Sequence, residues 1–396
     1  MREFPRLVLH PRRDRPIRNR HPWVFSGAVA QASPELPAGA IVDIYDAQGN
    51  WLARAAYHPQ AELCARVLTW DPSEIPDTTW LRQRIAASLE RRHFDRLPPT
   101  AARRLVFSEA DGLPGLIVDR YGEYLVVSLL TAFWEQRREL LTEVLVEQVQ
   151  PKGIFERSDG ETRAREGLPP AIGPLYGPEP PELVPFEEAG CRFLADVRAG
   201  QKTGFYLDQR ENRARIAQLA SGARMLNVFS YTGAFGIVAL THGADSVLNI
   251  EASQDAAALG DRHAEENGVQ NRWETIVGDA FQELRRLRND GERFDLVVLD
   301  PPKFASTKHH LERACRGYKD LNLLAIQLLR PGGILATFSC TGLVDPKLFR
   351  QVVAAAAMDS KREVRLLEKR TQPDDHPILM TFPESEYLKG LILRVD

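Results

Sequence analysis

The stretch FDLVVLDPPK, residues 294–303, decides the fold class of the chain. Its first six residues are apolar except for Asp295, which is typical of a strand buried on both faces of a parallel sheet. The run stops at Asp300, and Pro301 and Pro302 then fix the backbone of the following loop. In a doubly wound α/β sheet the ligand lies across the carboxyl ends of the strands. The sequence therefore predicts that Asp300 faces a bound ligand.

A second strand-like run, Gly333 to Phe338, leads into Ser339 and Cys340. An acid and a thiol at two such strand ends can face one substrate. That pair suits methylation of carbon 5 of a pyrimidine, because a thiolate that adds at C6 makes C5 reactive toward a methyl donor. We expect Cys340 to be the nucleophile and Asp300 to contact N3 and N4 of the base. Lys303 would hold a phosphate or lower the pKa of the thiol.

Strand-like and helix-like segments alternate from about residue 186 onward, which predicts a parallel sheet with right-handed crossovers. The predicted strands cover residues 225–229, 246–250, 273–277, 294–299 and 334–338, and the predicted helices cover 235–242, 254–267, 281–289 and 320–329. Two more strands are expected over 363–367 and 387–395. The fold class is therefore α/β.

Three consecutive strand ends carry the groups that a nucleoside cofactor needs. The first is NVFSYTGAFG, residues 227–236, where Gly233 and Gly236 let the backbone turn sharply beside a ligand. Glu251 ends the second strand and can accept hydrogen bonds from both ribose hydroxyls. Asp279 follows the third and can accept from an adenine amine. This order is typical of S-adenosylmethionine (SAM) sites, and the lack of G-x-G-x-x-G disfavours a nicotinamide cofactor. Further candidate contacts to the cofactor are Tyr206 and Gln209.

Two segments precede this domain. Residues 1–73 read as a small all-β module of short strands and turns, and residues 74–185 read as a mixed α/β domain. The Pro- and Gly-rich stretch 168–185 is expected to be a linker. The cofactor domain would then cover 186–396.

Bulk composition narrows the functional classes. No apolar run approaches the roughly 20 residues of a membrane span, and the four cysteines are too widely spaced for a metal knuckle or a disulfide framework. We therefore expect a cytoplasmic protein without a metal site. The net charge is −3, but residues 1–20 hold seven arginines against Glu3 and Asp14, and such a patch suits phosphates. The candidate RNA contacts are Arg18, Arg20, His21, Trp23, Arg316 and Lys319. Trp23 suits a barrel core equally well, and Arg316 and Lys319 suit a solvated face equally well.

Several long strings resemble the bacterial 23S ribosomal RNA 5-methylcytosine methyltransferases that carry an N-terminal PUA domain. They are HPWVFSGAV (21–29), SEADGLPGLIVDRYG (108–122), KTGFYLDQR (202–210), FSYTGAF (229–235), DPPKF (300–304), CRGYKDLN (315–322) and TFSCTG (337–342). The resemblance runs from end to end. It implies a small β-barrel PUA domain, a central α/β domain and a class I, Rossmann-like SAM-dependent methyltransferase domain.

The resemblance also implies site residues and a partner. Cys340 would be the nucleophile and Asp300 the base-binding residue. The cofactor would lie on the 229–236 turn, with Phe229, Tyr231 and Thr232 among its contacts, and beside Glu251 and Asp279. The implied partner is large-subunit ribosomal RNA, and a homodimer is left open.

The chain departs from the family pattern at few positions. Ala234 stands where a glycine is expected, and Thr341 where a serine is expected. Many RNA cytosine-C5 methyltransferases also have a second cysteine in the Asp-Pro loop that assists product release. Lys303 and Phe304 stand there instead, so the sequence does not identify the residue that assists release.

Three other functions are compatible with parts of this pattern. A methyltransferase acting on guanine N7 or an exocyclic amine would share the fold but would need no thiol. A non-catalytic RNA-binding protein would use the β module and keep the methyltransferase fold without its activity. A nicotinamide dehydrogenase would share only the sheet. The thiol at Cys340 is the feature that separates C5 methylation from the first of these.

Overall fold

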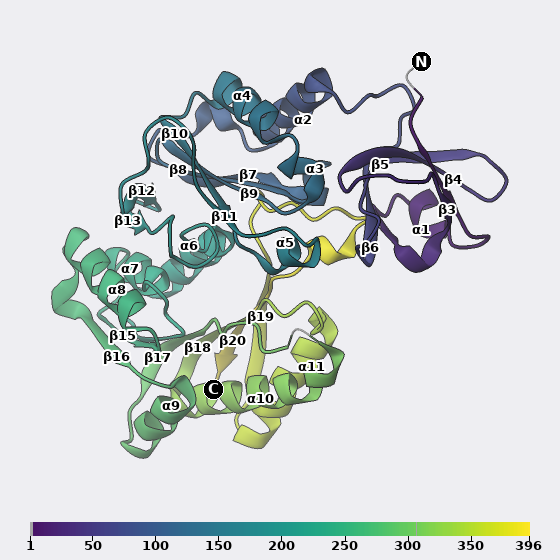
Figure 1. Cartoon of the computed structure of the whole chain (residues 1–396). Helices are drawn as coiled ribbons and strands as arrows, with labels where there is room; N and C mark the ends of the chain where they lie inside the picture. Colours follow the sequence, from purple (N-terminus) through teal and green to yellow (C-terminus); the bar gives the residue numbers. More distant parts are fainter. Residues whose placement is uncertain (1–2, 306) are drawn as a thin grey trace. The chain divides into compact units, whose positions relative to one another are not determined.

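The computed structural model describes residues 3–305 and 307–396 (Figure 1). The chain forms two compact units, and each is considered by itself below. The first unit consists of Met1–Phe186, Ala195–Leu207 and Asp374–Ser385, and the second of Glu187–Leu194, Asp208–Pro373 and Glu386–Asp396. The division of the chain at residues 73 and 185 stays a prediction.

The N-terminal part of the first unit is a six-stranded sheet in the order β2-β6-β5-β4-β1-β3. Its strands are β1 (Arg6–Leu9), β2 (Trp23–Phe25), β3 (Val29–Ala32), β4 (Ala40–Tyr45), β5 (Trp51–Tyr57) and β6 (Leu63–Thr69), with a short helix α1 (Arg15–Arg18). Aliphatic side chains such as Leu7, Ile44 and Val67 form its core. The strands predicted for the all-β module are present, and β3 is an additional strand that was not predicted.

The rest of the first unit contains a five-stranded sheet in the order β11-β10-β9-β8-β7. The strands are β7 (Ala102–Phe107), β8 (Leu116–Tyr121), β9 (Tyr124–Leu129), β10 (Gly153–Ser158) and β11 (Ala171–Tyr176), and the helices are α2 (Thr78–Arg91), α3 (Ala132–Glu135), α4 (Arg138–Val149) and α5 (Glu161–Arg165). The linker prediction for 168–185 is wrong over β11, which pairs antiparallel with β10. Pro174 and Gly173 are tolerated there because β11 is an edge strand.

The second unit is built on a seven-stranded sheet in the order β16-β15-β14-β17-β18-β20-β19. Its strands are β14 (Arg224–Val228), β15 (Ser246–Glu251), β16 (Trp273–Val277), β17 (Phe294–Leu299), β18 (Leu329–Ser339), β19 (Val364–Arg370) and β20 (Lys389–Val395). The first five in sheet order are parallel, and β20 lies antiparallel to both β18 and β19. The predicted parallel α/β sheet and the two added strands are confirmed.

Helices cover both faces of this sheet (Figure 1). On one face lie α6 (Arg210–Leu219), α7 (Ala234–Thr241) and α8 (Gln254–Glu266), and on the other α9 (Ala280–Asn289), α10 (Leu311–Leu328) and α11 (Pro346–Ser360). A two-stranded sheet of β12 (Val184–Glu188) and β13 (Cys191–Ala195) lies where the chain passes from the first unit to the second. Helices α6 and α11 and the β12–β13 pair were not predicted.

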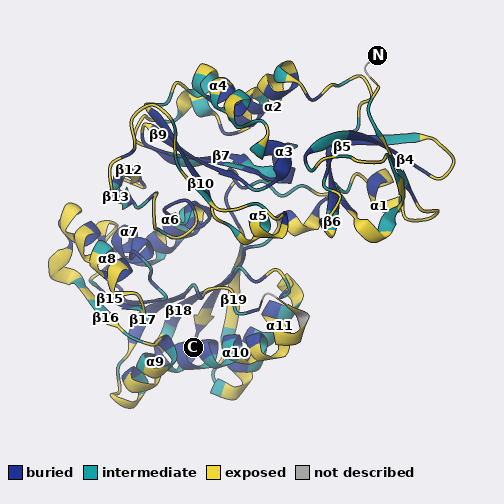
Figure 2. Cartoon of the chain, in the orientation of Figure 1, coloured by how far each residue is buried: buried dark blue, intermediate teal, exposed yellow. Residues whose placement is uncertain are grey.

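The second unit has its core between the sheet and helices α9, α10 and α11. The central strands β14 and β17 are almost wholly buried, which explains their largely apolar sequences. Figure 2 shows the buried residues of α10 and α11 on the side of each helix that faces the sheet. Because β14 and β17 are neighbours whose connections run in opposite directions, their carboxyl ends form the switch point where α/β sheets bind ligands.

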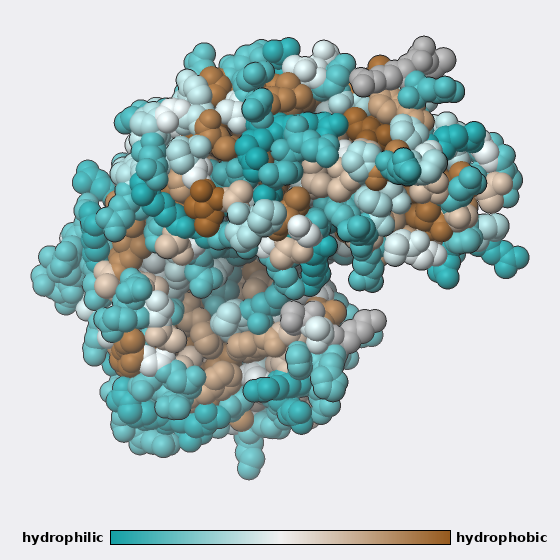
Figure 3. Space-filling view, viewed as in Figure 1, coloured by the Kyte–Doolittle hydropathy of each residue, from teal (hydrophilic) through white to brown (hydrophobic). Residues whose placement is uncertain are grey.

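Helix α8 begins after a capping serine and is followed by a glycine. The hydroxyl of Ser253 accepts a hydrogen bond from the amide of Ala256 at 3.2 Å, as an N-cap does. Gly268 has a φ of 67° just beyond the helix. On the faces visible in Figure 3 hydrophilic residues predominate and apolar ones are scattered between them. Within the described part of the chain, no helix is long and apolar enough to cross a membrane.

Candidate active site

The turn between β14 and α7 has an unusual backbone. Phe229 and Tyr231 have φ values of 60° and 50°, which large side chains rarely adopt, and Gly233 has a φ of 75°. A Cβ on Gly233 would come within 2.1 Å of the Trp273 ring, and one on Gly236 within 2.8 Å of it. Left-handed conformations of large residues are held only where surrounding structure enforces them, and they gather at ligand sites. The predicted sharp turn is therefore present and needs both glycines.

The Glu251 carboxylate holds this turn. It accepts the backbone N–H of Tyr231 at 2.7 Å through Oε2 and that of Ser253 at 2.9 Å through Oε1. Glu251 is only partly buried. Each carboxylate oxygen has a second lone pair, so Glu251 can still accept hydrogen bonds from a ligand. Its position next to the turn follows from the parallel pairing of β14 with β15.

Buried polar atoms in the same unit lack partners, as expected beside a polar ligand. The Thr232 hydroxyl and the Gln209 Nε2 atom have no hydrogen-bond partner among the described residues, although the two residues are 1% and 2% exposed. Buried polar groups are normally hydrogen-bonded, so orphaned ones indicate a ligand or an ordered water. A SAM molecule has an amine, a carboxylate and hydroxyls that would satisfy such atoms. The residues present thus fit this cofactor.

Asp279 and Tyr206, two other predicted cofactor contacts, each form a hydrogen bond within the protein. Asp279 is exposed, and one of its oxygens caps helix α9 by accepting the Gln282 N–H at 3.0 Å. A carboxylate has two oxygens, so the cap is compatible with binding a ligand amine. Tyr206 belongs to the first unit, where its hydroxyl donates to Gln201 at 2.8 Å. The contact of Tyr206 with the cofactor stays a prediction.

The acid and the thiol lie at the carboxyl ends of adjacent parallel strands. Asp300 follows β17 and Cys340 follows β18, and the two strands pair with Leu299 opposite Thr337. Both residues are partly exposed. Burial is the main cause that raises the pKa of Tyr318 to about 12, and the charges of Cys340 and Asp300 act in the same direction. The two predicted residues therefore lie at the same edge of the sheet.

Tyr318 ties the two loops together, a role that the sequence did not reveal. Its buried hydroxyl accepts a hydrogen bond from Ser339 at 2.9 Å and lies 2.9 Å from the Thr341 hydroxyl. Thr341 in turn accepts the backbone N–H of Phe304 at 3.3 Å, and the Phe304 ring packs on the Tyr318 ring at 4.8 Å. The loop that carries Asp300 and the loop that carries Cys340 are thus fixed to each other through α10.

Lys389 is a second residue that the sequence analysis missed. It begins β20, lies opposite Ser339 in the antiparallel register with β18, and is only 5% exposed. Lys303, by contrast, is exposed on the loop after Asp300. Nothing local in the sequence distinguishes the two lysines, since only the pairing of β18 with β20 brings Lys389 to the thiol loop.

The basic residues predicted to contact RNA lie in both units. In the second unit Arg316 and Lys319 lie on α10, in ion pairs with Glu312 at 3.3 Å and with Asp359 at 2.7 Å. In the first unit Arg18 and Arg20 are exposed. Arg18 forms ion pairs with Asp14 and Asp46. Arg2, which contributed to the predicted basic patch, lies outside the described residues.

Trp23 is used in packing within the first unit. Its indole N–H donates to Glu109 at 2.8 Å, and its ring meets the Phe382 ring edge-on at 4.7 Å. His21 lies against the same two rings and is 3.2 Å from Glu384. These contacts favour the barrel-core interpretation of Trp23, and its contact with RNA stays a prediction.

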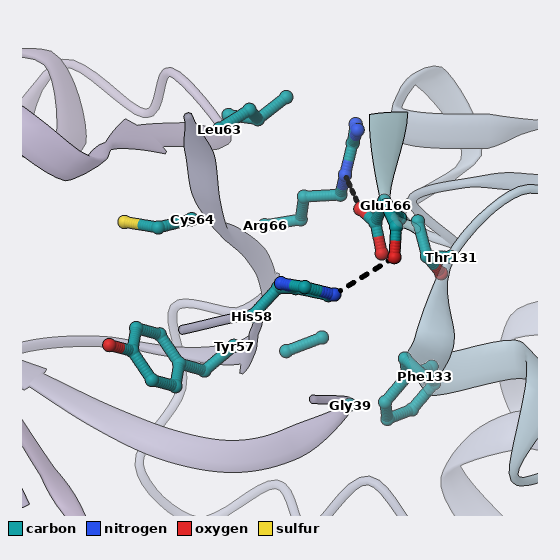
Figure 4. Close-up of a pocket in the computed structure, with 10 residues that line it drawn as sticks. Gly39, Tyr57, His58, Leu63, Cys64, Arg66, Thr131, Phe133 and Glu166 are labelled. Carbon is teal, nitrogen blue, oxygen red and sulfur yellow. Dashed lines mark hydrogen bonds and ion pairs between the residues drawn. The ribbon is translucent and has the colours of Figure 1, made fainter. Parts of the chain in front are cut away.

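A small cavity in the first unit is lined by His58, Arg66 and Glu166 among others (Figure 4). His58 Nε2 lies 3.1 Å from the Glu166 main-chain oxygen, and Arg66 Nε donates to the Glu166 carboxylate at 3.4 Å. The cavity has room for about one water molecule. It is too small for a nucleotide, and its polar groups bond to one another, so it is a packing feature.

Comparison with known proteins agrees with this architecture. A family model of S-adenosylmethionine-dependent methyltransferases matches residues 123–392, and a model of a PUA-like domain matches residues 7–70. The fold is that of SMU.776, a protein assigned as a methyltransferase and solved with SAH (TM-score 0.86, 22% identity, 98% of this chain and 100% of that one). A Streptococcus mutans protein assigned as SAM-dependent is similar, with a TM-score of 0.85 and 22% identity over the same shares.

The fold and the site together define a SAM-dependent methyltransferase with an N-terminal PUA-like domain. Proteins named ribosomal RNA large subunit methyltransferase I are 43% identical to this chain in Klebsiella pneumoniae (strain 342), over 394 residues, and in Salmonella heidelberg (strain SL476), over 395 residues. In both cases the match covers 99% of this chain and 98% of the relative. The chain belongs to the family of ribosomal RNA large subunit methyltransferase I.

Proposed function

We propose that this protein methylates carbon 5 of a cytosine in large-subunit ribosomal RNA, in the cytoplasm, through a covalent bond between Cys340 and C6 of the base. The observation that carries the proposal is that Asp300 and Cys340 directly follow two adjacent parallel strands and so lie at one edge of the sheet. The names of the relatives support ribosomal RNA as the substrate. A cytosine must leave any base stack to reach a thiol at this edge, so a single-stranded or flipped-out base is the expected form.

In the proposed reaction, each group of the site has its own role. Bound SAM supplies an electrophilic methyl group. The Cys340 thiolate adds to C6, and Asp300 contacts N3 and N4 while the ring takes up the electron pair. C5 then accepts the methyl group and gives up its proton to a base. The bond between sulfur and C6 breaks, and its electron pair returns to Cys340.

The cofactor would lie along the turn after β14. Phe229, Tyr231, Thr232, Gly233 and Gly236 would line it, and the orphaned Thr232 hydroxyl and Gln209 Nε2 support this placement. Glu251 would accept from the ribose hydroxyls and Asp279 from the adenine amine. Tyr206 stays a predicted contact.

Replacing Glu251 by glutamine should weaken SAM binding about 10- to 100-fold, because a hydrogen bond to a charged group contributes about 1.5–3 kcal/mol. Isothermal titration calorimetry with SAM measures this. Glu274→Gln is the matched control, since Glu274 lies exposed on neighbouring β16. Equal affinity in wild type and Glu251→Gln would remove Glu251 from the cofactor site.

The proposed function is tested by incubating the purified protein with unmodified large-subunit ribosomal RNA and methyl-labelled SAM. The RNA is digested to nucleosides, and the labelled nucleoside is identified by its mass and chromatographic position. Label in 5-methylcytidine supports the proposal. Label in a methylated guanosine, or in N4-methylcytidine, contradicts it and favours direct attack by a nitrogen.

Binding to RNA should weaken strongly with salt. If about four phosphates are contacted, the affinity for single-stranded RNA falls about 10- to 100-fold between about 50 and 200 mM salt. Arg20→Ser should reduce the salt slope by nearly one unit, because Arg20 is exposed in the Arg-rich segment. Arg82→Ser is the control, since Arg82 lies on helix α2 and forms an ion pair with Glu147 on helix α4. A slope that is flat in the wild type would argue against RNA as the partner.

A further inference from the structure

Lys389 lies beside the nucleophile loop although its sequence position is far from it. It is the first residue of β20 and pairs with Ser339, the last residue of β18, which directly precedes Cys340. Its relative exposure is only 5%. Lysines are seldom buried to this extent unless a partner compensates the charge. The buried amine of Lys389 therefore needs a compensating partner.

Two backbone carbonyls hold the amine in place. Lys389 Nζ donates to the main-chain oxygens of Thr341 and Tyr387, both at 2.8 Å. Thr341 directly follows Cys340, so the first bond fixes the amine to the loop that carries the thiol. An ammonium has three protons, and these two bonds use two of them. The third position is available either for a proton donated to a neighbour or for the lone pair of the neutral amine.

The surroundings make the protonation of this amine sensitive to the thiol. Burial lowers the pKa of Lys389 to about 8, and the positive charge of Lys303 acts in the same direction. The negative charge of Cys340 is the first of the charges that raise the pKa, ahead of those of Glu386 and Asp345. A cysteine thiol has an ordinary pKa of about 8.5. The ammonium of Lys389 and a thiolate on Cys340 therefore stabilise each other.

We propose that Lys389 is the positioning residue whose ammonium stabilises the Cys340 thiolate and holds it ready for attack. When the thiolate forms, the S–H bond breaks, the proton passes to solvent, and the electron pair stays on sulfur beside the ammonium. When sulfur later leaves C6, the thiolate returns to the same ammonium. The inference rests on the proposed function, because it assigns a helper to the nucleophile named there.

The test is the rate at which iodoacetamide alkylates Cys340 as a function of pH, since only the thiolate reacts. The whole protein is used without RNA or SAM, and the labelled peptide that contains Cys340 is quantified by mass spectrometry. In the wild type the midpoint should lie below the ordinary thiol value of about 8.5. In Lys389→Met it should rise by about one pH unit or more, so that alkylation at pH 7 slows about tenfold.

The pH range of the effect follows from the lowered pKa of Lys389. The ammonium is present below about 8 and is lost above it, so its effect on the thiolate belongs to neutral and acidic pH. The alkylation rates of wild type and variant should therefore converge at high pH. If Lys389 had only a structural role, its replacement would lower the alkylation rate at every pH or leave it unchanged, and the midpoint would stay the same.

Controls separate charge from packing. Lys389→Gln keeps an N–H donor for the carbonyls but removes the charge, and it should behave like Lys389→Met. Lys369→Met removes an exposed lysine from neighbouring β19 and should leave the midpoint unchanged. SAM affinity and circular dichroism check that each variant folds.

The outcomes distinguish this inference from the proposed function. Equal midpoints in folded wild type, Lys389→Met and Lys389→Gln would overturn the role of Lys389, even if 5-methylcytidine is formed. A wild-type midpoint at or above about 8.5 would also overturn it, with no variant needed. A shifted midpoint in a protein that makes no 5-methylcytidine would uphold the pairing of Lys389 with Cys340 and reject the proposed reaction.

Discussion

Replacement of Cys340 by alanine should reduce formation of 5-methylcytidine by at least about 10³-fold, because removal of a covalent nucleophile leaves no route to activate C5. SAM affinity should stay within about twofold, since the cofactor turn follows β14 rather than β18. The rate is measured as labelled 5-methylcytidine per enzyme in single-turnover reactions. Cys315→Ala is the matched control, because Cys315 is a partly exposed cysteine on α10 in the same unit.

A trapping experiment tests the covalent role of Cys340 without the measurement of a rate. In RNA that contains 5-fluorocytidine, the methylated adduct cannot lose fluorine as a cation, so sulfur stays bonded to C6. The wild type and Cys315→Ala should give a complex of protein and RNA that survives denaturation, and Cys340→Ala should give none. Methylation that persists in Cys340→Ala would show that the base attacks directly, and Cys340 would then have only a packing role.

The fold of the second unit was largely predictable because buried parallel strands have a distinctive sequence. β17 contains one partly exposed residue, Asp295, in an otherwise buried run, and β14 and β15 are similar. The same reasoning failed at β11, whose residues alternate between partly buried and exposed. An edge strand with a Gly and a Pro resembles a loop, since half of its backbone groups need no partner in the sheet.

The candidate site was predictable only where the sheet itself determines proximity. Asp300 and Cys340 could be paired in advance because adjacent parallel strands end at the same edge. Tyr318 and Lys389 could not, because their places depend on the packing of α10 and on the antiparallel pairing of β20 with β18. Sequence patterns indicate which residues follow a strand, whereas contacts between distant segments depend on tertiary structure.

The replacement of Asp300 by asparagine should lower the methylation rate about 10²- to 10⁴-fold, the usual contribution of a group that handles protons in the transition state. An amide has nearly the same shape and can still bond to the base, but it cannot donate an acid proton to N3 while the ring takes up the electron pair. The loss should therefore appear in the single-turnover rate with saturating RNA and SAM.

Asp295→Asn is the control for this change. Asp295 lies on the same strand, near its opposite end, where it accepts from Arg330 at 2.8 Å and from the Arg224 N–H at 2.9 Å. Its methylation rate should stay within about twofold of the wild type. Alkylation of Cys340 by iodoacetamide should persist in Asp300→Asn, because the thiolate is formed before the base is engaged. If Asp300→Asn retained the full rate, Asp300 would only stabilise the conformation of its loop. The cytosine would then have to be bound by main-chain groups of that loop.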